Sequence, residues 1–230
     1  MVTDLMELLE VLHNKMMRNR KAFFLMLIIL LLLLTVTIRL ISKDLKVPYY
    51  TTTDMTPQWV KPLQENRHII RQFSFTDQNG NIVTRNKFND HITVVNFFFT
   101  SCPGICKKLT HGMKEVQTEF INDEKVLLLS HTVNPEKDNV SVLKQYADIN
   151  GAIKSKWFFV TGQRSAIYNI ARNSYYADED MGWKRDSSTF LHTENILLID
   201  KKHQIRGVYK GTIPLEIEHL KTDIKLLEEE

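Results

Sequence analysis

The chain has 230 residues, of which 43% are hydrophobic and 25% are charged, with only two cysteines and a formal net charge of +3. These fractions are typical of a folded protein, and they exclude collagen, low-complexity sequence and general disorder. Two cysteines are too few for a disulfide scaffold or for a zinc site built from thiolates alone. Residues 42–230 carry 25 basic and 24 acidic side chains. No basic block marks a nucleic-acid surface, so we expect no nucleic-acid partner.

The first element of the chain is an uncharged apolar stretch, AFFLMLIILLLLLTVTI, at residues 22–38. With Leu40 and Ile41 it reaches the length of about 20 residues that spans a bilayer. We therefore predict a transmembrane anchor over residues 22–41. Basic side chains directly precede it, so residues 1–21 should remain in the cytoplasm. A cleaved signal peptide is the competing interpretation, but the sequence Arg-Leu-Ile-Ser-Lys that follows is unlike a small-residue cleavage site.

Residues 42–67 contain three prolines and a Thr-Thr-Thr-Asp run that break any regular period, and we interpret them as a tether. From residue 68 to residue 230 the patterns follow the order ββ, βα, βα, βα and ββα. Such alternation favours parallel strands with helices on both faces, and the closing hairpin makes the sheet mixed. The predicted fold class is therefore α/β, a thioredoxin-like mixed sheet with an N-terminal β-hairpin, preceded by one transmembrane helix.

Both cysteines directly follow the predicted strand at residues 91–100, in the run Cys102-Pro103-Gly104-Ile105-Cys106. Pro103 suits the first position of a helix, which would make Cys102 the capping residue. A thiol at a helix N-terminus feels the positive end of the helix dipole, which lowers its pKa. Cys106 returns to the same face one turn later. We expect a redox-active pair that closes into a disulfide or binds a soft metal.

A stabilising disulfide, or two buried small residues, is the alternative interpretation of this pair. Closing a loop of about five residues contributes roughly 2 kcal/mol, against about 4.7 kcal/mol for a loop of about 100 residues. Two thiolates suit copper(I), with a histidine as third ligand, whereas structural zinc would need further protein ligands. Of the eight histidines, His203 and His219 are expected to be solvated. His131 and His192, in or beside predicted strands, remain candidates.

Four segments resemble the Sco (SenC) family of copper chaperones and redox proteins. They are FFFTSCPGIC at residues 97–106, SHTVNPEKD at 130–138, WFFVTG at 157–162 and FLHTENILLID at 190–200. The resemblance covers most of residues 68–227, and it implies that Cys102, Cys106 and His192 are the metal ligands, with no such role for His131. Lys107 and Asn134 depart from the family's usual proline and aspartate, but neither departure removes a ligand.

The resemblance implies a membrane-anchored metallochaperone that binds copper(I), and in a second form copper(II). It would deliver copper to the dinuclear copper centre of cytochrome c oxidase, so the partner would be the copper-bearing subunit of that enzyme. The alternative function is a thiol–disulfide reductase acting on cysteines of a partner protein, and a third is an anchored binding module with incidental cysteines. No catalytic residue is assigned beyond the redox pair Cys102 and Cys106.

The amino-terminal segment also bears on location. It is short and acidic, unlike an Arg-rich mitochondrial transit peptide. We therefore expect a bacterial inner membrane protein with a single span, whose C-terminal domain, residues 68–230, faces the periplasm.

Overall fold

The computed structural model describes residues 20, 23–37, 46–50, 68–177 and 193–230. The chain divides into two compact units, Met1–Lys46 and Val47–Glu230. In the first unit, residues 23–37 are helical and exposed. Within the described residues, we find no helix that combines the length and the apolar character needed to cross a bilayer. The other residues of the predicted anchor, 22 and 38–41, lie outside the described part of the chain.

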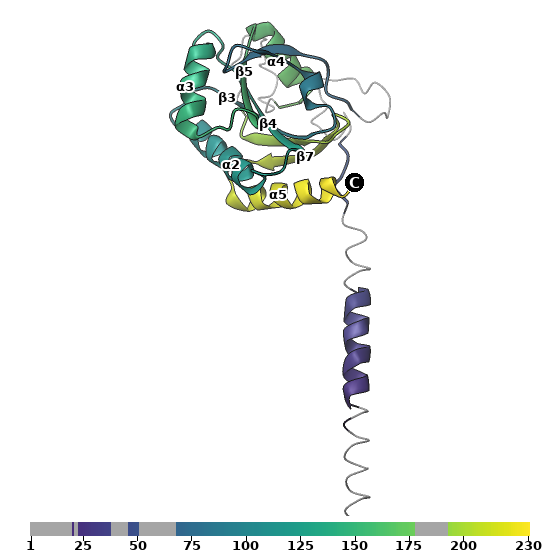
Figure 1. The fold of residues 1–230 in the computed structure, drawn as a ribbon. Helices are drawn as coiled ribbons and strands as arrows, with labels where there is room; N and C mark the ends of the chain where they lie inside the picture. Colours follow the sequence, from purple (N-terminus) through teal and green to yellow (C-terminus); the bar gives the residue numbers. More distant parts are fainter. Residues whose placement is uncertain (1–19, 21–22, 38–45, 51–67, 178–192) are drawn as a thin grey trace, which may run out of the picture. The chain divides into compact units, whose positions relative to one another are not determined.

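A seven-stranded mixed sheet with the strand order β2-β1-β5-β4-β3-β6-β7 forms the centre of the second unit (Figure 1). The strands are β1 Ser74–Asp77, β2 Ile82–Thr84, β3 Ile92–Phe98, β4 Val126–Thr132, β5 Trp157–Thr161, β6 Asn195–Ile199 and β7 Ile205–Lys210. Strands β3, β4 and β5 run parallel to one another. The hairpin β1–β2 joins β5 antiparallel, and the hairpin β6–β7 joins β3 antiparallel. The predicted mixed α/β sheet with an N-terminal hairpin is confirmed.

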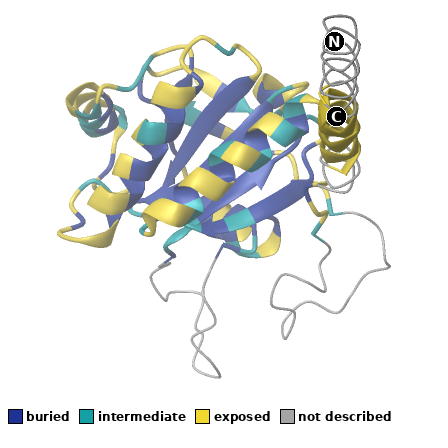
Figure 2. Cartoon of the chain, turned by 90° about the horizontal axis from the view of Figure 1, so that it is seen from below, coloured by how far each residue is buried: buried dark blue, intermediate teal, exposed yellow. Residues whose placement is uncertain are grey.

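Helices cover both faces of this sheet. The first face packs against α2 (Ile105–Glu119), α3 (Val140–Asn150) and α5 (Pro214–Glu228), and the second against α4 (Arg164–Asn173) and the short 3-10 helix η1 (Arg85–Phe88). Because successive strand residues point to opposite faces, β3 sends Phe98 to the first layer and Phe97 to the second. Figure 2 shows the result, with buried strands between helices that are exposed on their outer sides.

Local sequence signals set several helix boundaries. The Asn139 side chain accepts the backbone N–H of Val142 at 3.1 Å and so caps the start of α3. Gly151 ends the same helix with a φ of 70°, a left-handed conformation that glycine adopts without steric cost. Pro214 begins α5, where its missing N–H would have had no partner within the helix.

The second unit begins at Val47, within the stretch assigned to a tether from sequence. Arg206 on β7, only 2% exposed, donates hydrogen bonds to the carbonyl oxygens of Val47 at 2.7 Å and Pro48 at 3.0 Å. The same guanidinium binds Asp200 at 3.3 Å and both carboxylate oxygens of Glu230 at 2.8 and 2.9 Å. One buried cation therefore fastens the start of the unit, the β6–β7 turn and residue 230 to one another.

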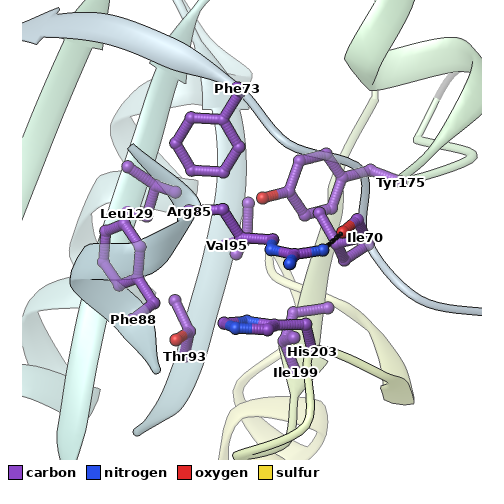
Figure 3. Close-up of a pocket in the computed structure, with 10 residues that line it drawn as sticks. All are labelled: Ile70, Phe73, Arg85, Phe88, Thr93, Val95, Leu129, Tyr175, Ile199 and His203. Carbon is purple, nitrogen blue, oxygen red and sulfur yellow. Dashed lines mark hydrogen bonds between the residues drawn. The ribbon is translucent and has the colours of Figure 1, made fainter. Parts of the chain in front are cut away.

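The second layer contains a small cavity of about 10 Å³ (Figure 3). In the close-up, the Arg85 guanidinium lies between the rings of Tyr175 and His203, and its Nη1 donates to the carbonyl oxygen of Ile70 at 2.7 Å. Arg85 Nε and Thr93 Oγ1 have no hydrogen-bond partner among the described residues. The volume is about that of one water molecule. This cavity is therefore too small for a substrate or cofactor.

A fully buried histidine, His131 on β4, also lies in the second layer. Its ring packs against those of Phe73, Phe75, Phe97 and Tyr175, with centroid distances of 5.7, 5.4, 5.1 and 5.5 Å. Neither ring nitrogen has a partner among the described residues. Burial lowers the pKa of His131 to about 3, because a charged imidazolium would lose its hydration without compensation. The folded state therefore holds this ring neutral.

Acid should unfold the protein partly through His131. Its pKa is near 6.5 in the unfolded chain and about 3 in the folded one, so its contribution to stability is complete above pH 6.5 and is lost as the pH falls toward 3. We expect the free energy of unfolding to fall by about 1.4 kcal/mol for each pH unit within that window. The measurement is urea unfolding as a function of pH, for wild type and for His131→Phe, in which that part of the acid dependence should vanish.

The control for this experiment is His111→Gln, since the His111 side chain is 74% exposed and should leave the acid dependence as it is. Identical pH profiles for wild type and His131→Phe would contradict the prediction.

Candidate redox and metal site

Cys102 and Cys106 lie at the carboxyl end of β3, where the chain enters α2. The predicted helix start at Pro103 is wrong, because Pro103 and Gly104 form a bend and α2 begins at Ile105 with Gly104 as N-cap. The Cys102 sulfur nevertheless accepts the backbone N–H of Cys106 at 3.4 Å. The sulfur itself thus satisfies an amide of the first helical turn, a group that otherwise has no partner within the helix.

Both thiols are free and buried. Cys102 is 8% exposed and Cys106 is 4% exposed, and both belong to the apolar layer that α2, α3 and α5 build on the first face of the sheet. The β3–α2 junction offers a reactant an approach to them, because Ser101, Pro103 and Gly104 are exposed there. The structure brings together the two thiols that the sequence singled out.

The two thiols differ in acidity. Burial raises the pKa of the Cys102 thiol, but hydrogen bonds from the Cys106 thiol and from the backbone N–H groups of residues 104–106 outweigh it, so the pKa lies below its ordinary value. Burial raises the pKa of Cys106 to about 12, and its hydrogen bond to Cys102 and the charges of Cys102 and Asp138 add to that rise. Cys102 is therefore the thiolate of the pair, and Cys106 keeps its proton and donates it to the Cys102 sulfur.

Asp138 fixes the loop that carries Cys102. Its carboxylate is fully buried and accepts hydrogen bonds from the backbone N–H of Thr100 at 3.1 Å, the Thr100 hydroxyl at 2.5 Å and the Thr132 hydroxyl at 2.5 Å. These bonds tie the end of β3 to the end of β4. No role for Asp138 was predicted from the sequence, although an ionisable side chain just beyond a buried strand is a signal for one.

Tyr146 on α3 supports the other side of the pair. Its hydroxyl shares a hydrogen bond of 2.8 Å with the Thr110 hydroxyl, one turn after Cys106 on α2. The ring of Tyr146 packs against Phe98 at a centroid distance of 5.2 Å. Burial raises the pKa of Tyr146, and the cysteines and Asp138 add to the rise, so the phenol remains protonated beside the thiols.

The structure excludes one of the two candidate histidine ligands, His131, and does not describe the other, His192. His131 points to the second layer, whereas Cys102 and Cys106 belong to the first, so the sheet lies between His131 and the thiols. His192 lies outside the described residues. The part of the chain that the structure describes holds no group of three or more His, Cys, Asp or Glu side chains placed to share a metal ion. The expectation that His203 is solvated is wrong, because it is 8% exposed and its Nε2 is bonded to Asn89 Oδ1 at 2.8 Å.

The fold and the thiol pair at the β3–α2 junction define a thioredoxin-like protein with a two-cysteine site. The family model for SCO1/SenC matches residues 61–227 of this chain. The chain therefore belongs to the SCO1/SenC family.

Relatives and solved structures agree with this assignment. An SCO2-like protein of Rickettsia typhi is 31% identical over 147 residues, covering 60% of this chain and 68% of its own length. A SCO1/SenC family lipoprotein from Bacillus anthracis superposes with a TM-score of 0.62 at 23% identity, covering 71% of this chain and 96% of that structure. Bradyrhizobium japonicum ScoI, solved with copper bound, superposes with a TM-score of 0.55 at 24% identity, covering 69% and 99% of the two chains.

Alkylation should distinguish the two thiols. Near neutral pH, iodoacetamide should modify Cys102 at least about tenfold faster than Cys106, because only the thiolate is nucleophilic and the Cys106 pKa is raised. Peptide mass mapping of the reduced protein after short reaction times gives the two rates. In the Cys102→Ser variant, Cys106 loses the hydrogen bond to sulfur that raises its pKa and should react faster than it does in wild type. Preferential modification of Cys106 in wild type would refute this order.

Proposed function

We propose that this protein is a membrane-anchored copper(I)-binding metallochaperone, with Cys102 and Cys106 as thiolate ligands and His192 as a neutral imidazole ligand. The observation that carries the proposal is the pair of buried, free thiols at the β3–α2 junction, where the Cys102 sulfur accepts the backbone N–H of Cys106. Thiolates are soft ligands and favour copper(I), and an imidazole suits copper as well. The donor set of this chain therefore fits the metal, which in a chaperone is cargo to be handed on.

Related proteins support the copper assignment and indicate a recipient. Bradyrhizobium japonicum ScoI was solved with copper bound. BsSco is described as a member of the Sco family of cytochrome c oxidase assembly proteins, and a disulfide switch was identified in it. We propose that this chain delivers copper to the dinuclear copper centre of cytochrome c oxidase, with the copper-bearing subunit of that enzyme as partner.

The proposed location follows from the amino-terminal sequence. The apolar stretch at residues 22–41 has the length of a single span, and a Bacillus anthracis member of the family is a lipoprotein. We propose that residues 22–41 anchor the protein in a bacterial inner membrane and that the second unit faces the periplasm. This compartment permits the thiol pair to cycle between reduced and oxidised forms.

Redox state should control copper loading. Oxidation of Cys102 and Cys106 to a disulfide removes two electrons and the proton that Cys106 holds, and it leaves no thiolate to bind copper(I). Copper(I) binding in turn requires that Cys106 release the proton that it holds in the metal-free protein, since a metal ligand must be deprotonated.

Copper(I) titration of the reduced protein tests the ligand set. We expect one copper(I) per chain, with no binding after oxidation. His192→Ala should weaken binding by more than about 100-fold, because the loss of an outer-shell partner alone costs about 10–100-fold. Competition with a chelator of known affinity gives the constants.

The matched control is His131→Phe, which removes a histidine on the opposite face of the sheet and should leave copper affinity unchanged. Equal affinities for wild type and His192→Ala, with both thiols free, would exclude His192 as a ligand.

A second function, reduction of disulfides in a partner protein, is favoured by the unequal acidity of the two thiols. A low pKa on Cys102 suits an attacking thiolate, and the protonated Cys106 beside it suits a resolving thiol. This arrangement needs both cysteines but does not need His192 as a ligand.

Trapping of mixed disulfides tests this second function. Cys106→Ser should accumulate a covalent adduct with a disulfide-containing partner, because Cys102 attacks and no resolving thiol remains. Cys102→Ser should trap little, and His192→Ala should turn over like wild type. Non-reducing electrophoresis with mass spectrometry gives the adducts. Equal trapping by the two cysteine variants would contradict the assigned order of attack.

A further inference from the structure

The first turns of α2 form an exposed surface directly beside the thiol pair. Ile105, between the two cysteines in the sequence, is 38% exposed, and Lys107 and Lys108, which follow Cys106, are also exposed. Lys114 is exposed further along the same helix. We name Lys107, Lys108 and Lys114 the lysine face.

The lysine face carries unbalanced positive charge. No Asp or Glu occurs between residues 99 and 114, and none of the three lysines forms an ion pair with a carboxylate of the described residues. The acidic residues of α2 lie in its second half and are paired with α5, Glu115 with Lys221 at 3.4 Å and Glu119 with Lys225 at 2.6 Å. The packing of α5 therefore neutralises the acids of α2 and leaves the charge of the lysine face without an internal partner in the described structure.

Exposed apolar side chains at the start of α5 lie next to the lysine face. Helices α2 and α5 run in the same direction, because Gly112 lies against Ile217, Glu115 against Lys221 and Glu119 against Lys225. The start of α5 therefore lies level with the turn of α2 that contains Lys108. Figure 1 shows the two helices side by side. Ile213, 46% exposed, and Leu215, 63% exposed, occupy this start.

We propose that the lysine face, with Ile105 and the exposed start of α5, docks an acidic segment of the protein that exchanges copper or disulfides with the pair. This inference rests on the proposed function, since it names the chemistry of the partner at that site. Any partner that reaches buried Cys102 must cover the β3–α2 junction. Lys107 adjoins Cys106 in the chain and is exposed, so the lysine face borders the junction that a partner must cover. Opposite charges there steer the encounter and raise its rate.

The test uses the reduced full-length protein in neutral detergent and two synthetic peptides. Each peptide carries one cysteine as a mixed disulfide with thionitrobenzoate, flanked by glutamates in one peptide and by glutamines in the other. The Cys102 thiolate attacks the peptide sulfur and displaces coloured thionitrobenzoate. Cys106 then attacks Cys102, which releases the peptide thiol and closes the Cys102–Cys106 disulfide. Two protein thiols are oxidised and one mixed disulfide is reduced.

We expect wild type to react about tenfold faster with the acidic than with the neutral peptide at low salt, and the ratio to approach unity at high salt. The double variant Lys107→Glu/Lys108→Glu should abolish or invert this ratio, and the ratio cancels any change in the intrinsic reactivity of the thiol pair because both peptides react with the same protein. The matched control is Lys201→Glu/Lys202→Glu. That pair lies on the β6–β7 turn, at the opposite end of the sheet from the cysteines, because β6 runs antiparallel to β3. It should keep the wild-type ratio.

Two results would overturn the inference: equal wild-type rates for both peptides at low salt, or equal effects of the two lysine pairs. A failure of the proposed function is distinct from both. It would appear as an absence of copper(I) binding together with an absence of reaction with the neutral peptide, which does not depend on the lysine face.

Discussion

The buried carboxylate of Asp138 is the constraint on which the thiol site depends. No ion pair joins it to a cation of the described residues, and its charge is stabilised by three hydrogen bonds from Thr100 and Thr132. Hydrogen bonds to a charged group are stronger than those between neutral groups, and a carboxylate without them could not be buried at reasonable cost. The ends of two parallel strands are thereby joined, and the loop that presents Cys102 has a fixed starting point.

The position of this loop also determines which of the two thiols is ionised. Cys102 lies over the amide groups at the start of α2, whereas Cys106 lies deeper, near the negative charge of Asp138. The same two residues therefore present one anion and one proton donor in the absence of metal, and two anions when a soft cation replaces the proton. A redox role and a metal-binding role are both consistent with this geometry, because both begin at Cys102 and both require that Cys106 lose its proton.

Much of the fold could be predicted from sequence, because its central strands are long apolar runs. Strand β3, for instance, is buried at every position, as its β-branched and aromatic residues indicate. The start of α2 could not be predicted, since Pro103 fits a bend as well as a first helical turn. The burial of His203 depends on Asn89, more than a hundred residues away. Asp138 acts by accepting hydrogen bonds from Thr100, just beyond β3, and from Thr132, at the end of β4, a relation that spacing along the chain does not reveal.

The Arg206 contacts limit how far the second unit can move from an anchor. Val47 is fastened to β7, so the connection between the helical residues 23–37 and the second unit ends at that residue. If residues 22–41 lie in a membrane, six peptide links separate residue 41 from Val47, and a fully extended chain at about 3.3–3.6 Å per residue gives a maximum span of about 20–22 Å. The start of the second unit at Val47 would then stay within that distance of the membrane surface.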